Sequence, residues 1–355
     1  MGMPVRMVLH APGRDAGERA ARAAFARIAA LDAMLSDYRA DSELARLSTS
    51  SGTWVTVSPE LFTVLTTALD IARASDGAFD PTAGPLTHLW REGRRAGGLP
   101  SPADVTEART RVGWRLVELD SARRAVRLTR TGMQLDLGGI AKGFILREAL
   151  IVLTAHDAGA ALIAAGGDVL VGAAPPGRAG WQIAAPYAGA AFQARASSLT
   201  HAALATSGPI AQFIASGGAR HSHVIDPRTG LSVTSDRVVG VIAADAMLAD
   251  ALATALGVLG PEAGTALLDR VGPVEVSWSP MQLRCCPDGL QGADARNRRL
   301  RPLGLRTVAP VPLDMCRVGT GNPRSLRRGY IRRPRVAPTS AIGAAPQLHR
   351  STGNC

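Results

Sequence analysis

The sequence predicts an α+β domain over residues 1–282 and a disordered, Arg- and Pro-rich tail over residues 283–355. Strand and helix patterns alternate along the domain without internal repeats and without a regular βαβ order. That layout favours mixed or antiparallel sheets with flanking helices. The tail carries 14 arginines against three aspartates, whereas the domain carries 26 basic and 26 acidic residues. The tail also lacks a sustained period of 2 or 3.6 residues, which is typical of disorder.

The first two elements follow from the spacing of apolar residues. Val5, Met7 and Leu9 lie two residues apart, which places them on one face of a strand. Helical spacing then predicts a helix whose buried face is made by Ala20, Ala24, Ile28, Leu31 and Leu35. The chain therefore opens with a strand followed by an amphipathic helix.

Caps and turns predict the elements that follow. Ser58 and Pro59 are a helix cap and a first-turn proline, and this second helix ends near the Ser75 to Gly77 turn. Residues 117–128 predict a hairpin around Asp120. The later predictions are a helix over 140–154, strands over 161–165, 224–225 and 238–242, and helices over 246–259 and 261–271. We predict a surface loop over residues 91–102.

Composition excludes several kinds of protein. All four cysteines lie in the tail, so neither disulfides nor thiolate metal sites support the domain. No basic-then-apolar signal segment opens the chain, and no run of about 18 apolar residues predicts a membrane span. We therefore expect a cytoplasmic protein without a transmembrane segment, or a periplasmic or membrane-associated one if the true start lies upstream.

The basic tail raises the alternative of nucleic-acid binding. Tyr330 is its one aromatic residue, so the tail has almost nothing on which bases could stack. No recognisable nucleic-acid module accompanies it. We expect no nucleic-acid partner.

Lys142 is the only lysine among 40 basic residues. It lies in the segment D-L-G-G-I-A-K-G, from Asp136 to Gly143, where paired glycines let a ligand approach the backbone and a helix start offers free N–H groups to an anion. Because every other residue of this basic set is an arginine, the single lysine indicates a site where a compact ammonium is needed. The alternative is an ordinary strand-to-helix turn with a surface lysine.

Asp250 and Thr254 are four residues apart, hence on one face of the predicted helix over 246–259. A carboxylate and a hydroxyl are hard oxygen ligands suited to Mg²⁺, with positions left for water and phosphate oxygens. The alternative is that Asp250 caps the helix or faces solvent while Thr254 bonds back to a carbonyl.

His221 and His223 lie on the same side of a predicted strand, followed by a turn at Asp226. No third zinc ligand is evident nearby, so a proton carrier or phosphate neighbour is the better interpretation. The alternative is a hairpin with two exposed imidazoles. Two turn-rich segments, around Tyr38 and Phe79, place an aromatic ring where it could flank a flavin or adenine, although an aromatic residue in a loop is more often a packing anchor.

In their order along the chain, these segments resemble the ApbE family, the FAD:protein FMN transferases, over roughly residues 1–278. The resemblance rests on S-D-Y-R-A-D-S-E-L, D-G-A-F-D-P-T-A-G-P-L, L-D-L-G-G-I-A-K-G, A-A-G-G-D, A-T-S-G, H-V-I-D-P-R-T-G and A-D-A-L-A-T-A-L. It implies a T-fold-like α+β architecture and binding of FAD and Mg²⁺. It also implies transfer of FMN from FAD to a Thr or Ser hydroxyl of an acceptor flavoprotein subunit, with release of AMP.

The resemblance also implies the roles of individual residues. His223 and Lys142 are the expected catalytic residues. The expected metal site is formed by Gly139, Asp250 and Thr254. The expected FAD contacts are Met1, Tyr38, Ala78, Phe79, Asp80, Asp136, Lys142, Ser207 and His223. Met1 stands in a Met-Gly-Met start, a departure from the M-G-T-like segment that contributes to the flavin site in the family.

Two other functions use the same residues. FAD could be hydrolysed to FMN and AMP, with water in place of the acceptor hydroxyl. The chain could also bind flavin without catalysis, although the joint presence of Lys142, Asp250 and Thr254 argues against this.

Overall fold

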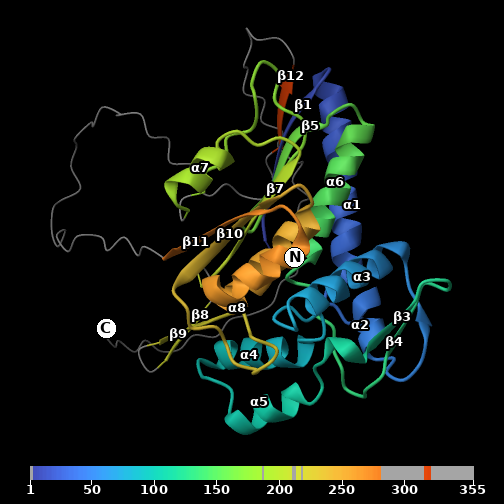
Figure 1. Ribbon diagram of the computed structural model, residues 1–355. Coiled ribbons are helices and arrows are strands. Elements are labelled where there is room, and N and C mark those ends of the chain that lie inside the picture. The colour runs from blue at the N-terminus through green and yellow to red at the C-terminus, as the bar shows by residue number, and fades with distance from the viewer. Residues whose placement is uncertain (1–2, 186–187, 210–212, 217–218, 281–315, 321–355) are drawn as a thin grey trace, which may run out of the picture.

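The computed structural model describes residues 3–185, 188–209, 213–216, 219–280 and 316–320 (Figure 1). Its central layer is a seven-stranded sheet in the order β11-β10-β7-β6-β5-β1-β12. Neighbouring strands are antiparallel, except that β12 runs parallel to β1. The strands are β1 (Val5–Ala11), β5 (Ala160–Ala165), β6 (Asp168–Val171), β7 (Ala202–Ser207), β10 (Arg237–Ala243), β11 (Glu275–Pro280) and β12 (Cys316–Thr320).

Helices cover both faces of this sheet. The main core lies between the sheet and a layer formed by α1 (Arg14–Leu35), α3 (Pro59–Ala74), α6 (Ala141–Ala155) and α8 (Ala246–Val271). The short helix α7 (Ala190–Ala196) packs with Trp181 in a smaller apolar cluster on the other face (Figure 1). The mixed layout without a βαβ order, predicted from the sequence, is confirmed.

A smaller group of elements lies beside the C-terminal end of α1, at the bottom of the view in Figure 1. It contains a three-stranded sheet, a two-stranded hairpin and short helices. Their bounds are α2 (Glu43–Ser48), β2 (Val55–Thr56), α4 (Gly84–Ala96), α5 (Pro102–Arg109), a 3₁₀ turn (Trp114–Leu116), β3 (Val117–Asp120), β4 (Ala125–Leu128), β8 (Phe213–Ser216) and β9 (Ala219–Ser222). Trp90 of α4 is buried against α5, and its indole N–H donates to the carbonyl of Gly230 (2.9 Å).

Local sequence signals account for most of these elements. Met7 and Leu9 are fully buried on β1, and the predicted apolar face of α1 is buried as expected. The Ser58 hydroxyl accepts from the backbone N–H of Leu61, so the predicted cap of α3 is confirmed. The two helices predicted over 246–259 and 261–271 form a single α8, interrupted at Gly260, where φ is 71°.

Two predictions are wrong. Much of the predicted surface loop over residues 91–102 is helical, because α4 continues to Ala96 with Arg91 packed inward. The segment around Val224 forms no ladder. Ile225 makes only an isolated bridge to Ser232, because the chain turns at Asp226.

Most of the predicted tail lies outside the described residues. Within residues 283–355 the structure describes Cys316–Thr320, which extends the large sheet as β12 beside β1. The rest of the predicted disordered tail stays a prediction. One described helix, α8, is long and apolar enough to cross a membrane, judged by length and composition alone. This is weak evidence, because core helices of soluble proteins often pass the same test. In the structure α8 packs against β7, β10 and α6.

The crossing of α6 and α8 requires a glycine. A Cβ atom added at Gly143 would lie 2.1 Å from the carbonyl oxygen of Ala246 and 2.8 Å from the Cα of Met247. These are backbone atoms, so the clash is relieved only if one helix moves. The two helix starts therefore approach each other as closely as they do because residue 143 has no side chain.

Gly143→Ala should lower the free energy of unfolding by about 1–3 kcal/mol or more, because the added methyl group overpacks a backbone contact. Gly98→Ala is the matched control, since a Cβ atom there meets nothing within 4 Å. Urea unfolding of the two variants and the wild type measures the difference. Equal stability of all three proteins would contradict the close approach of α6 and α8.

Candidate functional site

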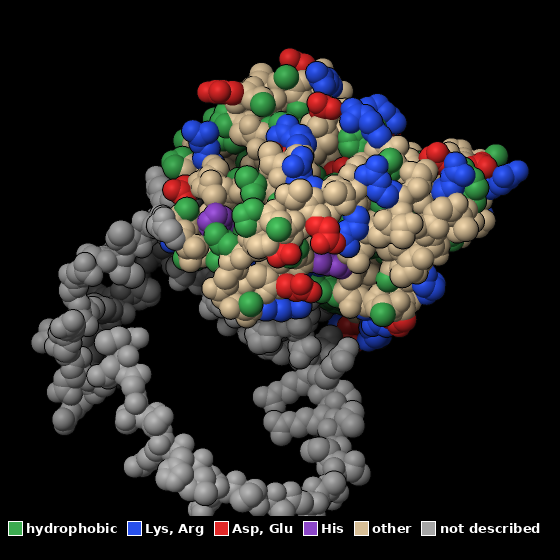
Figure 2. Space-filling view, turned by 90° about the horizontal axis from the view of Figure 1, so that it is seen from below, with side chains coloured by type: hydrophobic (Ala, Val, Ile, Leu, Met, Phe, Trp, Pro, Cys, Tyr) green, Lys and Arg blue, Asp and Glu red, His purple; other side chains and the backbone are tan. Residues whose placement is uncertain are grey.

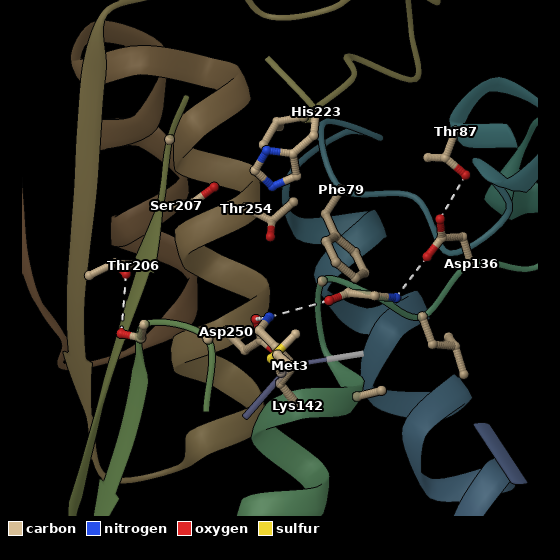
Figure 3. A pocket seen from close by; sticks show the side chains of 18 of the residues that line it. Met3, Phe79, Thr87, Asp136, Lys142, Thr206, Ser207, His223, Asp250 and Thr254 are labelled. Carbon is tan, nitrogen blue, oxygen red and sulfur yellow. Dashed lines mark hydrogen bonds and ion pairs between the residues drawn. The ribbon is translucent and has the colours of Figure 1, made fainter. Parts of the chain in front are cut away.

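A cavity of about 680 Å³ lies where the smaller group of elements meets the starts of α6 and α8 (Figure 3). Its lining includes residues from α4, the turn before α6, the β5–β6 turn, β7 and α8. Every predicted site residue that the structure describes lines it: Tyr38, Ala78, Phe79, Asp80, Asp136, Gly139, Lys142, Ser207, His223, Asp250 and Thr254. Met1 lies outside the described residues, and Met3 lines the cavity near that end of the chain.

Lys142 lies between two buried carboxylates. Its ammonium contacts Asp250 Oδ1 at 2.5 Å and Asp168 Oδ2 at 3.1 Å, and it donates to the carbonyl of Gly138 at 3.3 Å. The carboxylates are fixed by backbone donors, because Gly143 N–H reaches Asp250 Oδ2 (3.1 Å) and Thr206 N–H reaches Asp168 Oδ1 (3.0 Å). The side chains of both aspartates are about 5% exposed or less. The lysine is thus held at a defined position inside the cavity, and it is not a surface residue.

The charges in this cluster are incompletely balanced, since two carboxylates face one ammonium. Burial raises the pKa of Asp168 to about 6, even though Lys142 opposes the shift. Burial alone would lower the pKa of Lys142, but Asp168 and Asp250 together raise it above its ordinary value. The lysine is therefore charged at neutral pH, and the cluster retains an excess of negative charge that favours a further cation.

The predicted metal residues lie next to this cluster. Thr254 is one turn after Asp250 on α8, and a Cβ atom added at Gly139 would lie 2.9 Å from the Thr254 hydroxyl oxygen. Within the described part of the chain, no group of three or more Asp, Glu, His or Cys side chains is arranged to hold a metal. Residues Asp250 and Thr254 with the backbone near Gly139 offer hard oxygen atoms, so the donor chemistry fits Mg²⁺ with water or substrate oxygens completing its shell.

A second polar network forms another wall of the cavity. The guanidinium of Arg91 contacts Asp37 and also Asp136 Oδ2 at 2.8 Å. Thr87 donates to the same Asp136 oxygen (2.7 Å), and the other Asp136 oxygen accepts from the N–H of Gly138 (2.8 Å). Asp136 therefore ties α4 to the Gly-Gly turn that precedes Lys142.

Tyr38 and Phe79 present aromatic rings in different ways. The ring of Tyr38 is 68% exposed and lies 4.4 Å from the guanidinium carbon of Arg91. Phe79 is 4% exposed, and its ring contacts the Gly139 turn closely. Tyr38 is accessible to a flat ligand, whereas Phe79 is a packed part of the wall.

Asp80 lines the cavity, but its carboxylate serves the wall itself. One oxygen accepts from the N–H (2.8 Å) and hydroxyl (2.6 Å) of Thr82, and the other accepts from Trp114 N–H (2.9 Å). Burial raises the pKa of Asp80. Asp80 therefore orders the turn that positions Ala78 and Phe79.

The two histidines of the R-H-S-H segment separate. His223 follows the end of β9 and lines the cavity, near Ser207 and Thr254 (Figure 3). His221 instead packs against Trp90, with ring centroids 5.9 Å apart and planes 24° from parallel. The prediction that both rings share one side of a strand is wrong, because β9 ends at Ser222.

Asp168, Arg91 and Asp37 belong to the site but were not among its predicted residues. Asp168 ends the A-A-G-G-D segment, and its Gly-Gly pair was the signal that could have identified it. Gly166 and Gly167 have φ of 58° and 100°, a turn that brings Asp168 back toward Lys142. Arg91 fell in the predicted surface loop, so nothing in the pattern indicated its role.

Comparisons with known proteins identify the family. The model of the ApbE family matches residues 1–278. The FAD:protein FMN transferase of Treponema pallidum is 37% identical over 252 residues, covering 66% of this chain and 70% of that protein. The protein of the same name from Klebsiella pneumoniae is 30% identical over 301 residues, covering 81% and 92%.

Solved structures give the same result for the fold. The apo form of the flavinyl transferase ApbE from Pseudomonas stutzeri superposes with a TM-score of 0.64 at 29% identity, covering 74% of this chain and 82% of that one. An ApbE protein from Thermotoga maritima gives a TM-score of 0.63 at 29% identity, covering 73% and 89%.

The raised pKa of Asp168 has a consequence for stability. In the metal-free protein, the folded state holds the Asp168 proton more tightly than the unfolded state between pH 3.8 and about 6. This carboxyl's contribution to the free energy of unfolding therefore falls as pH rises through that window. Asp168→Asn removes this pH dependence. As pH rises from 4 to 7, the free energy of unfolding of the variant should therefore increase relative to that of wild type, on the order of 1–3 kcal/mol.

Denaturant unfolding in chelator at several pH values measures this difference. Asp70→Asn, at an exposed aspartate of α3, provides the baseline for the same substitution away from the cavity. A difference between wild type and Asp168→Asn that does not change with pH would contradict the assignment.

Proposed function

Because the chain belongs to the ApbE family and is a flavin transferase, we propose that it transfers the FMN part of FAD to a threonine or serine hydroxyl of an acceptor flavoprotein. The observation that supports this most is the charged cluster of Lys142, Asp168 and Asp250, of which Lys142 and Asp250 line the cavity, together with the exposed Tyr38 on another part of its lining. A dinucleotide has the matching arrangement, since its flat ring systems flank a central diphosphate.

The proposed reaction exchanges one P–O bond for another. The acceptor oxygen bonds to the phosphorus of the FMN half, the bond from this phosphorus to the bridging oxygen breaks, and AMP leaves with the bridging oxygen and its electron pair. The acceptor proton must be removed as the new bond forms. The main barrier is the negative charge on the phosphoryl and bridging oxygens.

The cluster provides a positive charge close to that centre. The ammonium of Lys142 is kept protonated by Asp168 and Asp250, so it places a compact positive charge beside the site proposed for the diphosphate. The Gly138-Gly139 turn before α6 also allows close approach of the ligand to the backbone.

Asp250, Thr254 and the backbone near Gly139 are the residues that would hold Mg²⁺. Such an ion neutralises the charge on diphosphate oxygens and on the leaving group. The i, i+4 spacing on α8 keeps the carboxylate and hydroxyl on the same side of the helix, facing the cavity. The excess negative charge of the cluster favours a cation at this place.

We assign the removal of the acceptor proton to His223. Its imidazole is exposed and lines the cavity on the segment that follows β9, so an acceptor hydroxyl can approach it from solvent. An imidazole is the side chain best suited to carry a proton near neutral pH. The buried carboxylates are less suitable, because both are occupied by Lys142 and by backbone donors.

Asp250→Ala should abolish flavin transfer, because it removes both the metal ligand and a partner of Lys142. The assay incubates the purified protein with FAD, Mg²⁺ and candidate flavoprotein subunits, then detects fluorescent acceptor bands on a denaturing gel. Asp269→Ala, at an exposed position of the same helix, is the control that should keep activity. Turnover like wild type in Asp250→Ala would remove the metal assignment. Release of AMP and free FMN without a labelled acceptor would instead identify a hydrolase.

Lys142→Arg should reduce transfer by roughly tenfold to a hundredfold while the protein stays folded. The planar guanidinium cannot take the place of an ammonium held between Asp250, Asp168 and the Gly138 carbonyl, and a misplaced charge-assisted hydrogen bond is worth about 1.5–3 kcal/mol. Arg147→Lys, farther along α6 and paired with Asp245, is the reciprocal control and should change little. Equal transfer rates for Lys142→Arg and wild type would show that charge alone matters at this position.

A further inference from the structure

Asp168 is a buried carboxylate for which the proposed reaction has no direct use. It lies on β6 within the seven-stranded sheet, and its Oδ1 accepts from the N–H of Thr206. Its position after the Gly166-Gly167 turn brings it within 3.1 Å of the Lys142 ammonium. This geometry needs an explanation.

Both oxygens of Asp250 have protein donors in the structure. Oδ2 accepts from the N–H of Gly143 at 3.1 Å, and Oδ1 lies 2.5 Å from the ammonium of Lys142. The Gly143 donor belongs to the backbone at the crossing of α6 and α8, so it cannot move away easily. Each carboxylate oxygen has a second lone pair, so a divalent cation can bind Asp250 Oδ1 beside the lysine, but the two positive charges then repel each other.

Among the described residues, Lys142 has one charged partner besides Asp250. Asp168 Oδ2 already faces its ammonium, and Asp168 is anchored through Oδ1 by the N–H of Thr206 on β7. An ammonium that leaves Asp250 can therefore stay in the cavity by pairing with Asp168 alone. Without Asp168, the same ammonium would have either to remain on Asp250 or to lose its charged partner.

We propose that Asp168 is a positioning residue that retains the Lys142 ammonium beside the diphosphate site when a divalent cation takes its place on Asp250. In the metal-free protein Lys142 occupies the cation's position and neutralises Asp250. When the cation binds, the lysine moves to Asp168 and remains available to the substrate. This inference rests on the proposed metal site at Asp250 and Thr254.

The chain offers an unusually direct probe, because Lys142 is its only lysine. Labelling with ¹⁵N-lysine therefore gives a single side-chain ammonium signal in the full-length protein. The ammonium is buried between two carboxylates, so its protons should exchange slowly enough for detection. Titration with Mg²⁺ alone, in the absence of FAD, follows the lysine without any need for activity.

In wild type, saturating Mg²⁺ should shift the lysine signal while its protons stay protected from exchange, since Asp168 still holds the ammonium. In Asp168→Asn, the Mg²⁺ dissociation constant should rise by roughly 10–100-fold, the usual effect of losing a residue that orients a metal site. At saturation, protection of the lysine protons should also be lost. Asp70→Asn, with the same substitution at an exposed site, should titrate like wild type.

A thermal shift with Mg²⁺ provides an independent measure of binding, and Asp250→Asn should abolish that shift. If Mg²⁺ stabilises wild type through Asp250 but leaves the wild-type lysine signal unchanged, the inference about Asp168 is overturned and the metal site stands. The same holds if Asp168→Asn behaves like wild type in both measurements. If Mg²⁺ neither stabilises wild type nor shifts its lysine signal, the proposed metal site and the inference fail together. The Mg²⁺ titration of the wild-type lysine signal tests the inference even if Asp168→Asn does not fold.

Discussion

The contact of one half-buried lysine with two buried aspartates is the interaction on which the site depends. It joins three elements that are distant in sequence, because Lys142 belongs to α6, Asp168 to β6 and Asp250 to α8. Removing charges from water is costly, so such a cluster persists only where backbone donors and close packing hold every partner in place. The N–H groups of Gly143 and Thr206 supply those donors. The glycine at position 143 serves twice, since it both lets α6 approach α8 and presents its N–H to Asp250.

The arrangement of the elements explains why the cavity has unlike walls. The sheet, α6 and α8 form the side that carries the charged cluster (Figure 3). The opposite wall is built from shorter elements and is held by Arg91 with Asp37 and Asp136. Away from the cavity, Arg side chains are scattered among Asp and Glu over the face seen in Figure 2. Exposed arginines of the domain form local pairs, as Arg73 does with Asp70. The unbalanced charge that matters for function is therefore the buried one.

How much of this the sequence predicts depends on the range of the interactions. The face of α1, the cap at Ser58 and the alternation in β1 are local, and all three predictions are confirmed. Lys142 could be singled out because it is the only lysine. Its second partner could not, because the pairing with Asp168 depends on how the β5–β6 turn folds back toward α6. Arg91 was missed for a related reason, since α4 is stabilised by burial of Trp90 that only the tertiary structure provides. His221 and His223 were predicted to act from one side, and the end of β9 at Ser222 separates them.

We propose that Asp250 and Thr254 present a cation to the diphosphate of FAD next to Lys142. The most direct measurement is an anomalous-scattering map from crystals of the full-length protein grown with Mn²⁺ and FAD. We expect a manganese peak in contact with the Asp250 carboxylate, the Thr254 hydroxyl and the diphosphate, with the Lys142 ammonium beside the same diphosphate. FAD bound in the cavity with no manganese at Asp250, or with manganese held by other residues, would contradict it.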